Sequence, residues 1–247
     1  MKAIILAAGR GTRMRHLTAN RPKCLLEIGG HSLLDWLKKA LALKEISDIV
    51  IVRGYRAEQI PLDGCLIVDN PNWEKYNIAS SLFCAEAWLT SDSCLVSYSD
   101  IIYTSRTAQQ ICSCEGDIVI PYNTRWLETW SRRFNDPLTD LENFKLTETG
   151  DLKEIGGGAL SYEDIQGQYM GLLKLTPKGF SMIQETLIHM DQDEIQHMDI
   201  TSLLSRILER GISIKTLPID DPWFEVDNEN DLKVGNEYWE AIMKLRE

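Results

Sequence analysis

The sequence predicts an α/β protein with a mixed, mostly parallel sheet flanked by helices, and a small antiparallel flap inserted into it. Short apolar runs alternate with helical patterns in the first half, which is typical of βαβ units. After Pro121 the pattern becomes that of a β-hairpin. A chain of 247 residues with 44% apolar content can bury the core of such a domain. We therefore expect a single domain over residues 1–247, with the flap at about 123–175.

The first strand is expected at 2–7, where the run KAIILA is almost entirely apolar. Residues 32–43 are expected to form an amphipathic helix, because leucines recur on one face and Ser32 can cap its N-terminus. A second helical pattern covers 81–89. The other strands of this half are expected at 48–53, 65–68, 93–98 and 116–121.

The second half contains the expected flap and the end of the domain. A hairpin is predicted over 143–155, with its turn around Gly150. Apolar and helical patterns then predict further elements in chain order. These are a strand at 165–175, helices at 177–187 and 199–209, a strand at 213–217 and a last helix at 228–244.

Composition excludes some classes of partner. The chain has 26 Lys and Arg against 37 Asp and Glu, a formal charge of −11. So acidic a chain is a poor generic binder of nucleic acid or of anionic membranes, although a local positive cluster can still bind an anionic substrate. The 6 cysteines lack CxxC spacing, which indicates reduced thiols. We see no signal-peptide pattern and no membrane span, so a cytosolic location is expected.

The strongest local signal is a glycine-rich turn directly after the first predicted strand. Small residues let the backbone approach phosphate oxygens and present N–H groups to them. Arg10, Arg13, Arg15 and Lys23 add positive charge in this otherwise acidic chain. The turn lacks the full GxGxxG of dinucleotide-binding proteins and the GK[ST] ending of a P-loop. The plainer alternative is a glycine turn with a solvated basic edge.

The strings LAAGRGTRM and RPKCLLEIGG resemble the signature of the NTP-transferase superfamily, which includes sugar-1-phosphate nucleotidyltransferases and phosphocholine cytidylyltransferases. The resemblance implies a Rossmann-like sheet. It also implies that Arg13 holds the β- and γ-phosphates of an NTP and that Lys23 contacts the α-phosphate and the incoming substrate. The turn residues that would bind the nucleotide are Leu6, Ala7, Ala8, Gly9, Gly11 and Thr12.

Two aspartates match the positions at which this superfamily holds magnesium. Asp100 follows a predicted parallel strand, where side chains point into the ligand crevice of such sheets. Asp227 precedes the last predicted helix. Carboxylate oxygens suit Mg²⁺, so we expect Asp100 and Asp227 to hold it. The plainer alternatives are that Asp100 is a turn residue and that Asp227 is a helix cap. Ile102 stands where many members carry a further acid, so the resemblance is to a single-acid variant.

Further segments resemble the nucleobase pocket of the cytidylyltransferase branch. A Gly-Tyr pair follows a predicted strand, and an Asn-x-x-Ser-Ser-Leu segment precedes a helix. Such side chains can read the edge of a pyrimidine, which favours CTP; plain N-capping by the serines is the alternative. The residues expected at the nucleotide are Gly54, Tyr55, Asn77, Ser80, Ser81 and Ser99.

Aromatic and charged strings of the second half predict the acceptor pocket. Aromatic faces and carboxylates suit an ammonium such as choline. The expected residues are Trp126, Trp130, Arg133, Asp140, Glu142, Gln168, Tyr169, Gly171, Trp223 and Glu225. Alternatively, the tryptophans form one buried helix face and the acids pair with Arg132 and Arg133. The strings WxxxWxRR, DPLxDxE and GQYMGL resemble the phosphocholine cytidylyltransferase-like branch, which also contains enzymes for aminoethylphosphonate-type acceptors.

Together these features predict a magnesium-dependent nucleotidyltransferase. It would move a nucleoside monophosphate, CMP from CTP in our preferred interpretation, to a small phosphate or phosphonate acceptor. Arg13, Lys23, Asp100 and Asp227 would carry the chemistry. The alternatives are a sugar-1-phosphate nucleotidyltransferase that uses UTP, GTP or dTTP, a non-catalytic nucleotide-binding subunit, and a dinucleotide-dependent oxidoreductase. We expect no nucleic-acid or membrane partner, and a homodimer is an open possibility.

Overall fold

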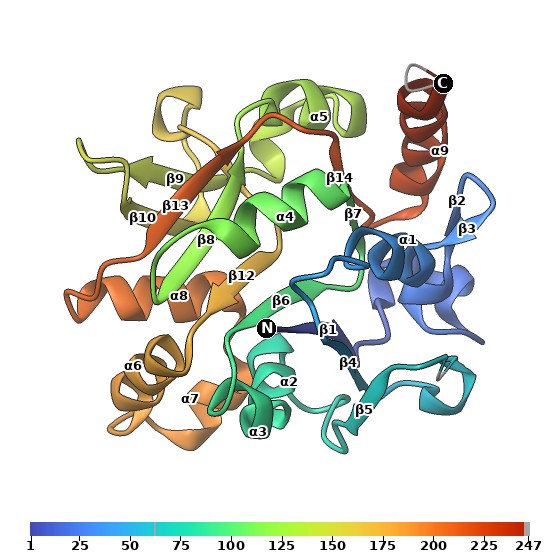
Figure 1. Cartoon of the computed structure of the whole chain (residues 1–247). Coiled ribbons are helices and arrows are strands. Elements are labelled where there is room, and N and C mark those ends of the chain that lie inside the picture. Colours follow the sequence, from blue (N-terminus) through green and yellow to red (C-terminus); the bar gives the residue numbers. More distant parts are fainter. Residues whose placement is uncertain (62, 245–247) are drawn as a thin grey trace.

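A mixed sheet lies at the centre of the molecule (Figure 1). The computed structural model describes residues 1–61 and 63–244, and within them eight strands form this sheet. They are β1 (Lys2–Ala7), β4 (Asp48–Arg53), β5 (Leu66–Asp69), β6 (Cys94–Tyr98), β8 (Ile118–Asn123), β11 (Gln168–Tyr169), β12 (Leu172–Leu175) and β13 (Lys215–Ile219).

The sheet is parallel on one side and mixed on the other. Strands β6, β1, β4 and β5 lie side by side in this order and are all parallel. Strand β12 is antiparallel to both β6 and β8, which it separates. Strand β13 pairs with β8 in parallel. The predicted fold class, a mixed and mostly parallel sheet flanked by helices, is confirmed.

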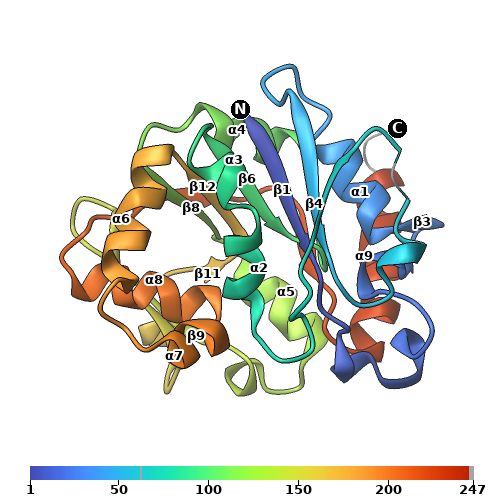
Figure 2. The ribbon, with the colours of Figure 1, turned by 90° about the horizontal axis from the view of Figure 1, so that it is seen from below.

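Helices cover both faces of the sheet because the side chains of each strand alternate between the faces. In β1, Ile4 and Leu6 pack with α2 (Ile78–Cys84), α6 (Pro177–Leu187) and α8 (Ile200–Glu209). Ile5 belongs to the opposite cluster, with α1 (Leu33–Ala40) and α4 (Ser105–Ser113). Figure 2 shows α6, α7 (Gln192–His197) and α8 grouped together, away from α1 and α9.

A third apolar cluster fixes the last helix, α9 (Glu229–Lys244). Trp239 of α9 meets Trp36 of α1 edge-on, with ring centroids 5.2 Å apart. The short sheet of β7 (Ile101–Tyr103) and β14 (Trp223–Glu225) contributes Ile102 and Phe224 to the same cluster. The cluster also lies beside the small hairpin of β2 (Glu27–Ile28) and β3 (His31–Ser32). This packing holds the segment between β14 and α9 against the end of β6.

The predicted hairpin forms β9 (Glu142–Leu146) and β10 (Leu152–Gly158), an antiparallel two-stranded sheet. Helix α5 (Trp126–Arg133) precedes it. The prediction of one strand over 165–175 is wrong, because Gly171 takes φ +69° and separates β11 from β12. Both strands join the central sheet along β8, so the later part of the expected flap segment belongs to that sheet.

Several boundaries differ from those predicted. Ser32 caps α1 through a capping box with Asp35, as expected, but the helix ends at Ala40. The helix expected at 81–89 starts earlier, at Ile78, and is divided into α2 and α3 (Glu86–Leu89). Helices α4 and α7 and the pair β7–β14 were not predicted. Short 3₁₀ segments occur at Thr12–Thr18, Lys23–Leu25, Ala57–Gln59, Pro137–Thr139 and Tyr162–Asp164. Within the described residues, no helix is long and apolar enough to span a bilayer.

The close approach of α6 to the start of β8 gives a test of the packing. A Cβ added to Gly179 would lie 2.0 Å from the backbone oxygen of Asp117. We expect Gly179→Ala to lose about 1–3 kcal/mol of unfolding free energy in urea titration, although alanine favours helices. The control is Gly158→Ala in β10, where an added Cβ meets nothing within 4 Å. Equal stability of the two variants would contradict this packing.

Candidate active site

A cavity of about 660 Å³ opens beside the carboxyl ends of β1 and β6. This is the edge at which open α/β sheets bind ligands. Its wall comes from the glycine turn after β1, the segment before α2, the end of β6, helix α5, the flap, the start of α8 and the end of β14. One cavity thus joins residues from the first and the last quarter of the chain.

The glycine turn forms one wall of the cavity. Strand β1 ends at Ala7, and Ala8, Gly9 and Gly11 line the cavity directly. Gly11 has φ +69°, and a Cβ there would lie 2.7 Å from Cδ of Lys23. A Cβ at Gly9 would meet no atom within 4 Å, so the backbone at this position faces open space. A ligand can therefore approach the backbone at Gly9, while Gly11 makes room for the lysine stem.

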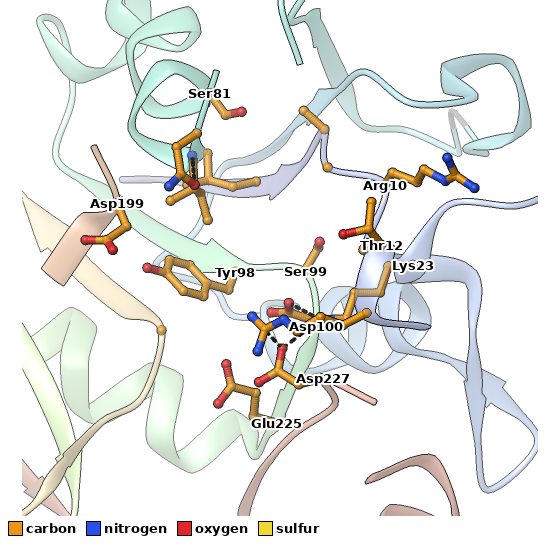
Figure 3. A pocket seen from close by; sticks show the side chains of 18 of the residues that line it. Arg10, Thr12, Lys23, Ser81, Tyr98, Ser99, Asp100, Asp199, Glu225 and Asp227 are labelled. Carbon is orange, nitrogen blue, oxygen red and sulfur yellow. Dashed lines mark hydrogen bonds and ion pairs between the residues drawn. The ribbon is translucent and has the colours of Figure 1, made fainter. Parts of the chain in front are cut away.

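Lys23, Asp100 and Asp227 converge in the cavity, although 204 residues separate the first from the last. The Lys23 Nζ donates to Asp100 Oδ2 at 2.6 Å and to Asp227 Oδ1 at 3.1 Å. An Arg13 nitrogen lies 3.5 Å from the same oxygen of Asp227. Figure 3 shows Lys23, Asp100 and Asp227 gathered in one part of the cavity. The structure thus brings together the four residues that the sequence predicted to carry the chemistry.

The burial of this cluster strengthens its charge interactions. The side chains of Lys23 and Asp227 are each 10% exposed, whereas that of Arg13 is 71% exposed. Burial lowers the pKa of Lys23, but the charges of Asp100 and Asp227 outweigh it and the pKa is raised. Burial raises the pKa of Asp227, but Lys23 and Arg13 more than offset it, and the pKa is lowered. Lys23 and Asp227 are therefore both charged at neutral pH.

The donor set fits a magnesium ion that is completed by substrate oxygens. The Oδ1 atom of Asp100 is buried and has no hydrogen-bond partner among the described residues. Mg²⁺ is commonly bound by one or two carboxylates together with substrate phosphates and water. Within the described residues, no three His, Cys, Asp or Glu side chains gather into a closed metal cage. An open pair of carboxylates is therefore the arrangement that this chain offers.

The opposite end of the cavity is acidic. Asp140, Glu142, Asp199 and Glu225 all line the cavity. In Figure 3, Asp199 lies far from Lys23, whereas Glu225 lies beside Asp227. Burial, with the nearby charge of Asp199, raises the pKa of Glu142 to about 7. Burial and the charge of Asp227 hold the pKa of Glu225 well above its ordinary value. Burial therefore favours the protonated form of both carboxyl groups.

Aromatic side chains enclose this acidic end. Tyr98 and Tyr169 meet at right angles, with ring centroids 6.0 Å apart, and both line the cavity. Trp130 also lines it and donates its Nε1 hydrogen to Asp140 at 3.2 Å. Gln168 holds the flap strand in place through a 2.7 Å hydrogen bond to the backbone oxygen of Glu142. The acidic end is thus a partly aromatic chamber.

Most of the predicted nucleotide residues line the cavity. They are Leu6, Ala8, Gly9, Gly11, Thr12, Arg13, Lys23, Asn77, Ser81 and Ser99. The lining, as far as the structure describes it, omits Ala7, Gly54, Tyr55 and Ser80. Gly54 packs beneath Trp73, Tyr55 bonds to the backbone of Ala19, and Ser80 bonds back to Asn77.

The predicted acceptor residues also divide in two. Trp130, Asp140, Glu142, Gln168, Tyr169, Gly171 and Glu225 line the cavity. Trp126, Trp223 and Arg133 are buried behind it. Trp126 stacks on Tyr162, and Trp223 stacks on Trp130. The two tryptophans of α5 are therefore packed side chains, as in the alternative interpretation, and only Trp130 also reaches the cavity.

Sequence reasoning missed several lining residues. Asp199 was considered only as part of a helix start, and it does cap α8 by accepting from the Ser202 backbone. Trp73 and Tyr76 lie in a turn-rich segment without a periodic pattern. Of these three residues, only Asp199 could have been predicted from the sequence. An acidic residue at the start of a helix can both cap the helix and face a ligand.

Comparison with known proteins agrees with this geometry. Residues 3–151 match the MobA-like NTP transferase domain. The chain belongs to this family and is a nucleotidyltransferase, which confirms the superfamily resemblance seen in the sequence.

Relatives with assigned activities include cytidylyltransferases. The CTP:phosphoglutamine cytidylyltransferase of Campylobacter jejuni is 31% identical over 251 residues, which cover 95% of this chain and 98% of the relative. The choline-phosphate cytidylyltransferase of Streptococcus pneumoniae is 41% identical over 87 residues, which cover 34% of this chain and 38% of the relative.

Solved structures share the fold. The inositol-1-phosphate CTP transferase from T. maritima aligns with a TM-score of 0.76 and 21% identity, over 97% of this chain and 96% of the other. The CTP:phosphocholine cytidylyltransferase from Streptococcus pneumoniae aligns with a TM-score of 0.72 and 19% identity, over 96% and 98%. Both solved structures therefore share this fold over nearly the whole length of the chain.

The raised pKa of Glu142 predicts a pH-dependent stability. In the folded protein this carboxyl keeps its proton to about pH 7, against 4.5 for the ordinary group. The free energy of unfolding therefore falls as the pH rises from about 4.5 to about 7. We expect Glu142→Gln to raise the free energy of unfolding more at pH 8 than at pH 5. The difference between the two pH values should be about 1–3 kcal/mol in urea titration. The control is Glu148→Gln in the exposed turn of the same hairpin. If the effect of Glu142→Gln on the free energy of unfolding does not change with pH, the raised pKa of Glu142 is refuted.

Proposed function

We propose that this enzyme transfers CMP from CTP to a small phosphate or phosphonate acceptor that carries an ammonium group, and releases pyrophosphate. The observation that carries the proposal is the polarity of one cavity. Lys23 and Arg13 lie at one end with Asp100 and Asp227, and a chamber of carboxylates and aromatic rings lies at the other. CTP is favoured because the two relatives described above are cytidylyltransferases for phosphoglutamine and choline phosphate.

The nucleotide would bind at the glycine turn. The open backbone at Gly9 gives phosphate oxygens close access to the turn. Arg13, largely exposed at the cavity mouth, suits the outer phosphates, and the buried Lys23 suits the α-phosphate. The base would lie toward Asn77 and Ser81, whose side chains line the cavity near the start of α2. This arrangement leaves the α-phosphorus between Lys23 and the acidic chamber.

Magnesium would be held by Asp100 and Asp227, with the buried Oδ1 of Asp100 available for it. When bound, Mg²⁺ would neutralise phosphate charge and hold donor and acceptor oxygens close together. Lys23 now neutralises the same two carboxylates, so it is placed to share its charge with a phosphate when a nucleotide enters.

The transfer itself needs little covalent help from the protein. An acceptor phosphate or phosphonate oxygen attacks the α-phosphorus of CTP, a new P–O bond forms, and the bond to the β-phosphate oxygen breaks. Pyrophosphate leaves with that electron pair. The attacking oxygen is already ionised near pH 7, so no general base is required. Lys23 and Arg13 stabilise the charge that develops, and the cavity holds the two reactants in line.

The acidic chamber selects the other end of the acceptor. In the described lining, the positive side chains are Arg10, Arg13 and Lys23, all at the nucleotide end. A quaternary or primary ammonium gains from Glu142 and Asp199 and from the rings of Tyr98 and Tyr169. A neutral sugar forgoes these charge interactions. We therefore rank amino-bearing acceptors above hexose-1-phosphates. A cytosolic location and a homodimer stay predictions.

A pyrophosphate-release screen tests the proposal. Purified enzyme with Mg²⁺ is offered CTP, UTP, GTP and dTTP against phosphocholine, phosphoethanolamine, 2-aminoethylphosphonate, phosphoglutamine and hexose-1-phosphates. We expect release with CTP and an amino-bearing acceptor. Turnover only with a hexose-1-phosphate would support the sugar-nucleotide alternative and overturn the proposed acceptor. Tight nucleotide binding without turnover for any pair would overturn the proposal as a whole.

Removal of the convergent charges tests the mechanism. Asp100→Ala removes a metal ligand, and Lys23→Ala removes the cation at the α-phosphate. We expect each variant to stay folded by circular dichroism and to lose turnover by 10²-fold or more, on the order of the loss for one transition-state partner. The control is Lys44→Ala, whose side chain is 87% exposed. Near-normal turnover of Lys23→Ala would remove this residue from the mechanism.

A further inference from the structure

A buried cation lies directly behind the cavity. The side chain of Arg133, at the end of α5, is 0% exposed. Its guanidinium carbon lies 5.1 Å from the ring centres of Trp130 and Phe134 and 5.9 Å from that of Phe224. An arginine enclosed in this way is costly unless carboxylates pair with it. Arg133 therefore does not reach the acceptor, and the prediction that it binds the acceptor is wrong.

The main partner of Arg133 is Asp231, in the first turn of α9. Arg133 Nε and Nη2 each donate to one oxygen of Asp231, both at 3.0 Å. Asp231 Oδ2 also accepts from the backbone nitrogen of Asp227 at 2.8 Å and from that of Asn228 at 3.2 Å. One carboxylate thus fixes both the guanidinium and the backbone of Asp227. Asp231 itself is fully buried.

Arg133 also reaches the side chains of the site. Its Nη2 donates to Asp227 Oδ2 at 3.3 Å, whereas the other oxygen of Asp227 faces Lys23 and Arg13. Its Nη1 lies 3.6 Å from Oε2 of Glu225 and has no hydrogen-bond partner in the part of the chain that the structure describes. One guanidinium therefore serves the proposed metal ligand Asp227 and the acidic-chamber residue Glu225 at once.

These contacts exceed what a stabilising ion pair requires. Asp231 alone satisfies a bidentate arginine. The contact with Oδ2 holds the Asp227 carboxylate so that Oδ1 points into the cavity. Groups that hydrogen-bond to metal-bound carboxylates set the orientation of these ligands, and their loss costs about 10–100-fold in metal affinity or activity. The contact with Glu225 extends the same support to the acceptor chamber.

We propose that Arg133, held by Asp231, is a positioning residue that orients Asp227 toward the metal and Glu225 toward the acceptor. The inference rests on the proposed function, because it assigns roles to these two carboxylates. It predicts that a substitution of Arg133 weakens metal binding and acceptor binding together, although Arg133 contacts neither the metal nor the acceptor. A purely structural ion pair would change stability alone.

The test compares Arg133→Lys with Arg132→Lys, its neighbour on the same helix. Arg132 is 49% exposed and pairs with Glu128, so it is the matched control. Lysine keeps the charge but cannot make the forked contact. Enzyme-bound Mn²⁺ is counted by electron paramagnetic resonance in the presence of α,β-methylene-CTP, which does not react. Kinetics with the preferred acceptor give kcat and KM in parallel.

For Arg133→Lys we expect Mn²⁺ to bind about 10–100-fold more weakly, kcat to fall and the acceptor KM to rise, while Arg132→Lys matches the parent enzyme. Misfolding is addressed by a second variant, Arg133→Met with Asp231→Asn. It removes the buried pair as a neutral unit, and asparagine can still accept from the backbone N–H groups. We expect this variant to be folded and still weak in Mn²⁺ binding.

Unchanged Mn²⁺ affinity in either folded variant would overturn the positioning role and leave the pair structural. That result is distinct from failure of the proposed function. If the parent enzyme transfers no CMP to any acceptor, the function fails, whatever the variants do. If the parent enzyme turns over and the variants bind Mn²⁺ as it does, only the role of Arg133 fails.

Discussion

The ammonium of Lys23, held between Asp100 and Asp227, is the interaction on which the site depends. It joins three segments that are far apart in the chain: the loop after the glycine turn, the end of β6 and the link from β14 to α9. Two buried carboxylates this close would repel each other without a cation. In our proposal, the same two carboxylates bind the metal ion and Lys23 faces the triphosphate.

Opposite polarity at the two ends of the cavity follows from how the fold supplies charge. Lys23 and Arg13 come from the first turns after β1, whereas the acids of the far chamber come from the flap, the start of α8 and the end of β14. An acidic chain thus concentrates positive charge where phosphates would lie and negative charge where an ammonium would lie. Behind both, Arg133 compensates part of the buried negative charge.

Local patterns in the sequence were enough for the sheet, the hairpin and the capped start of α1, because these depend on periodicity and on a few residues in sequence. The glycine turn and its cations were found for the same reason. The burial of Trp126 was foreseen only as the alternative to an acceptor role, and that of Trp223 and Arg133 was not predicted. An aromatic or charged side chain in a polar string looks the same whether it faces a ligand or packs behind one. Asp199 and Asp231 were missed because their capping roles hid what else they contact.

The most direct test is a crystal structure with α,β-methylene-CTP and Mg²⁺. Our account predicts Mg²⁺ bound to both Asp100 and Asp227, the α-phosphate beside Lys23, and the triphosphate against the backbone at Gly9. A triphosphate bound elsewhere in the cavity, or a metal that contacts neither carboxylate, would contradict it.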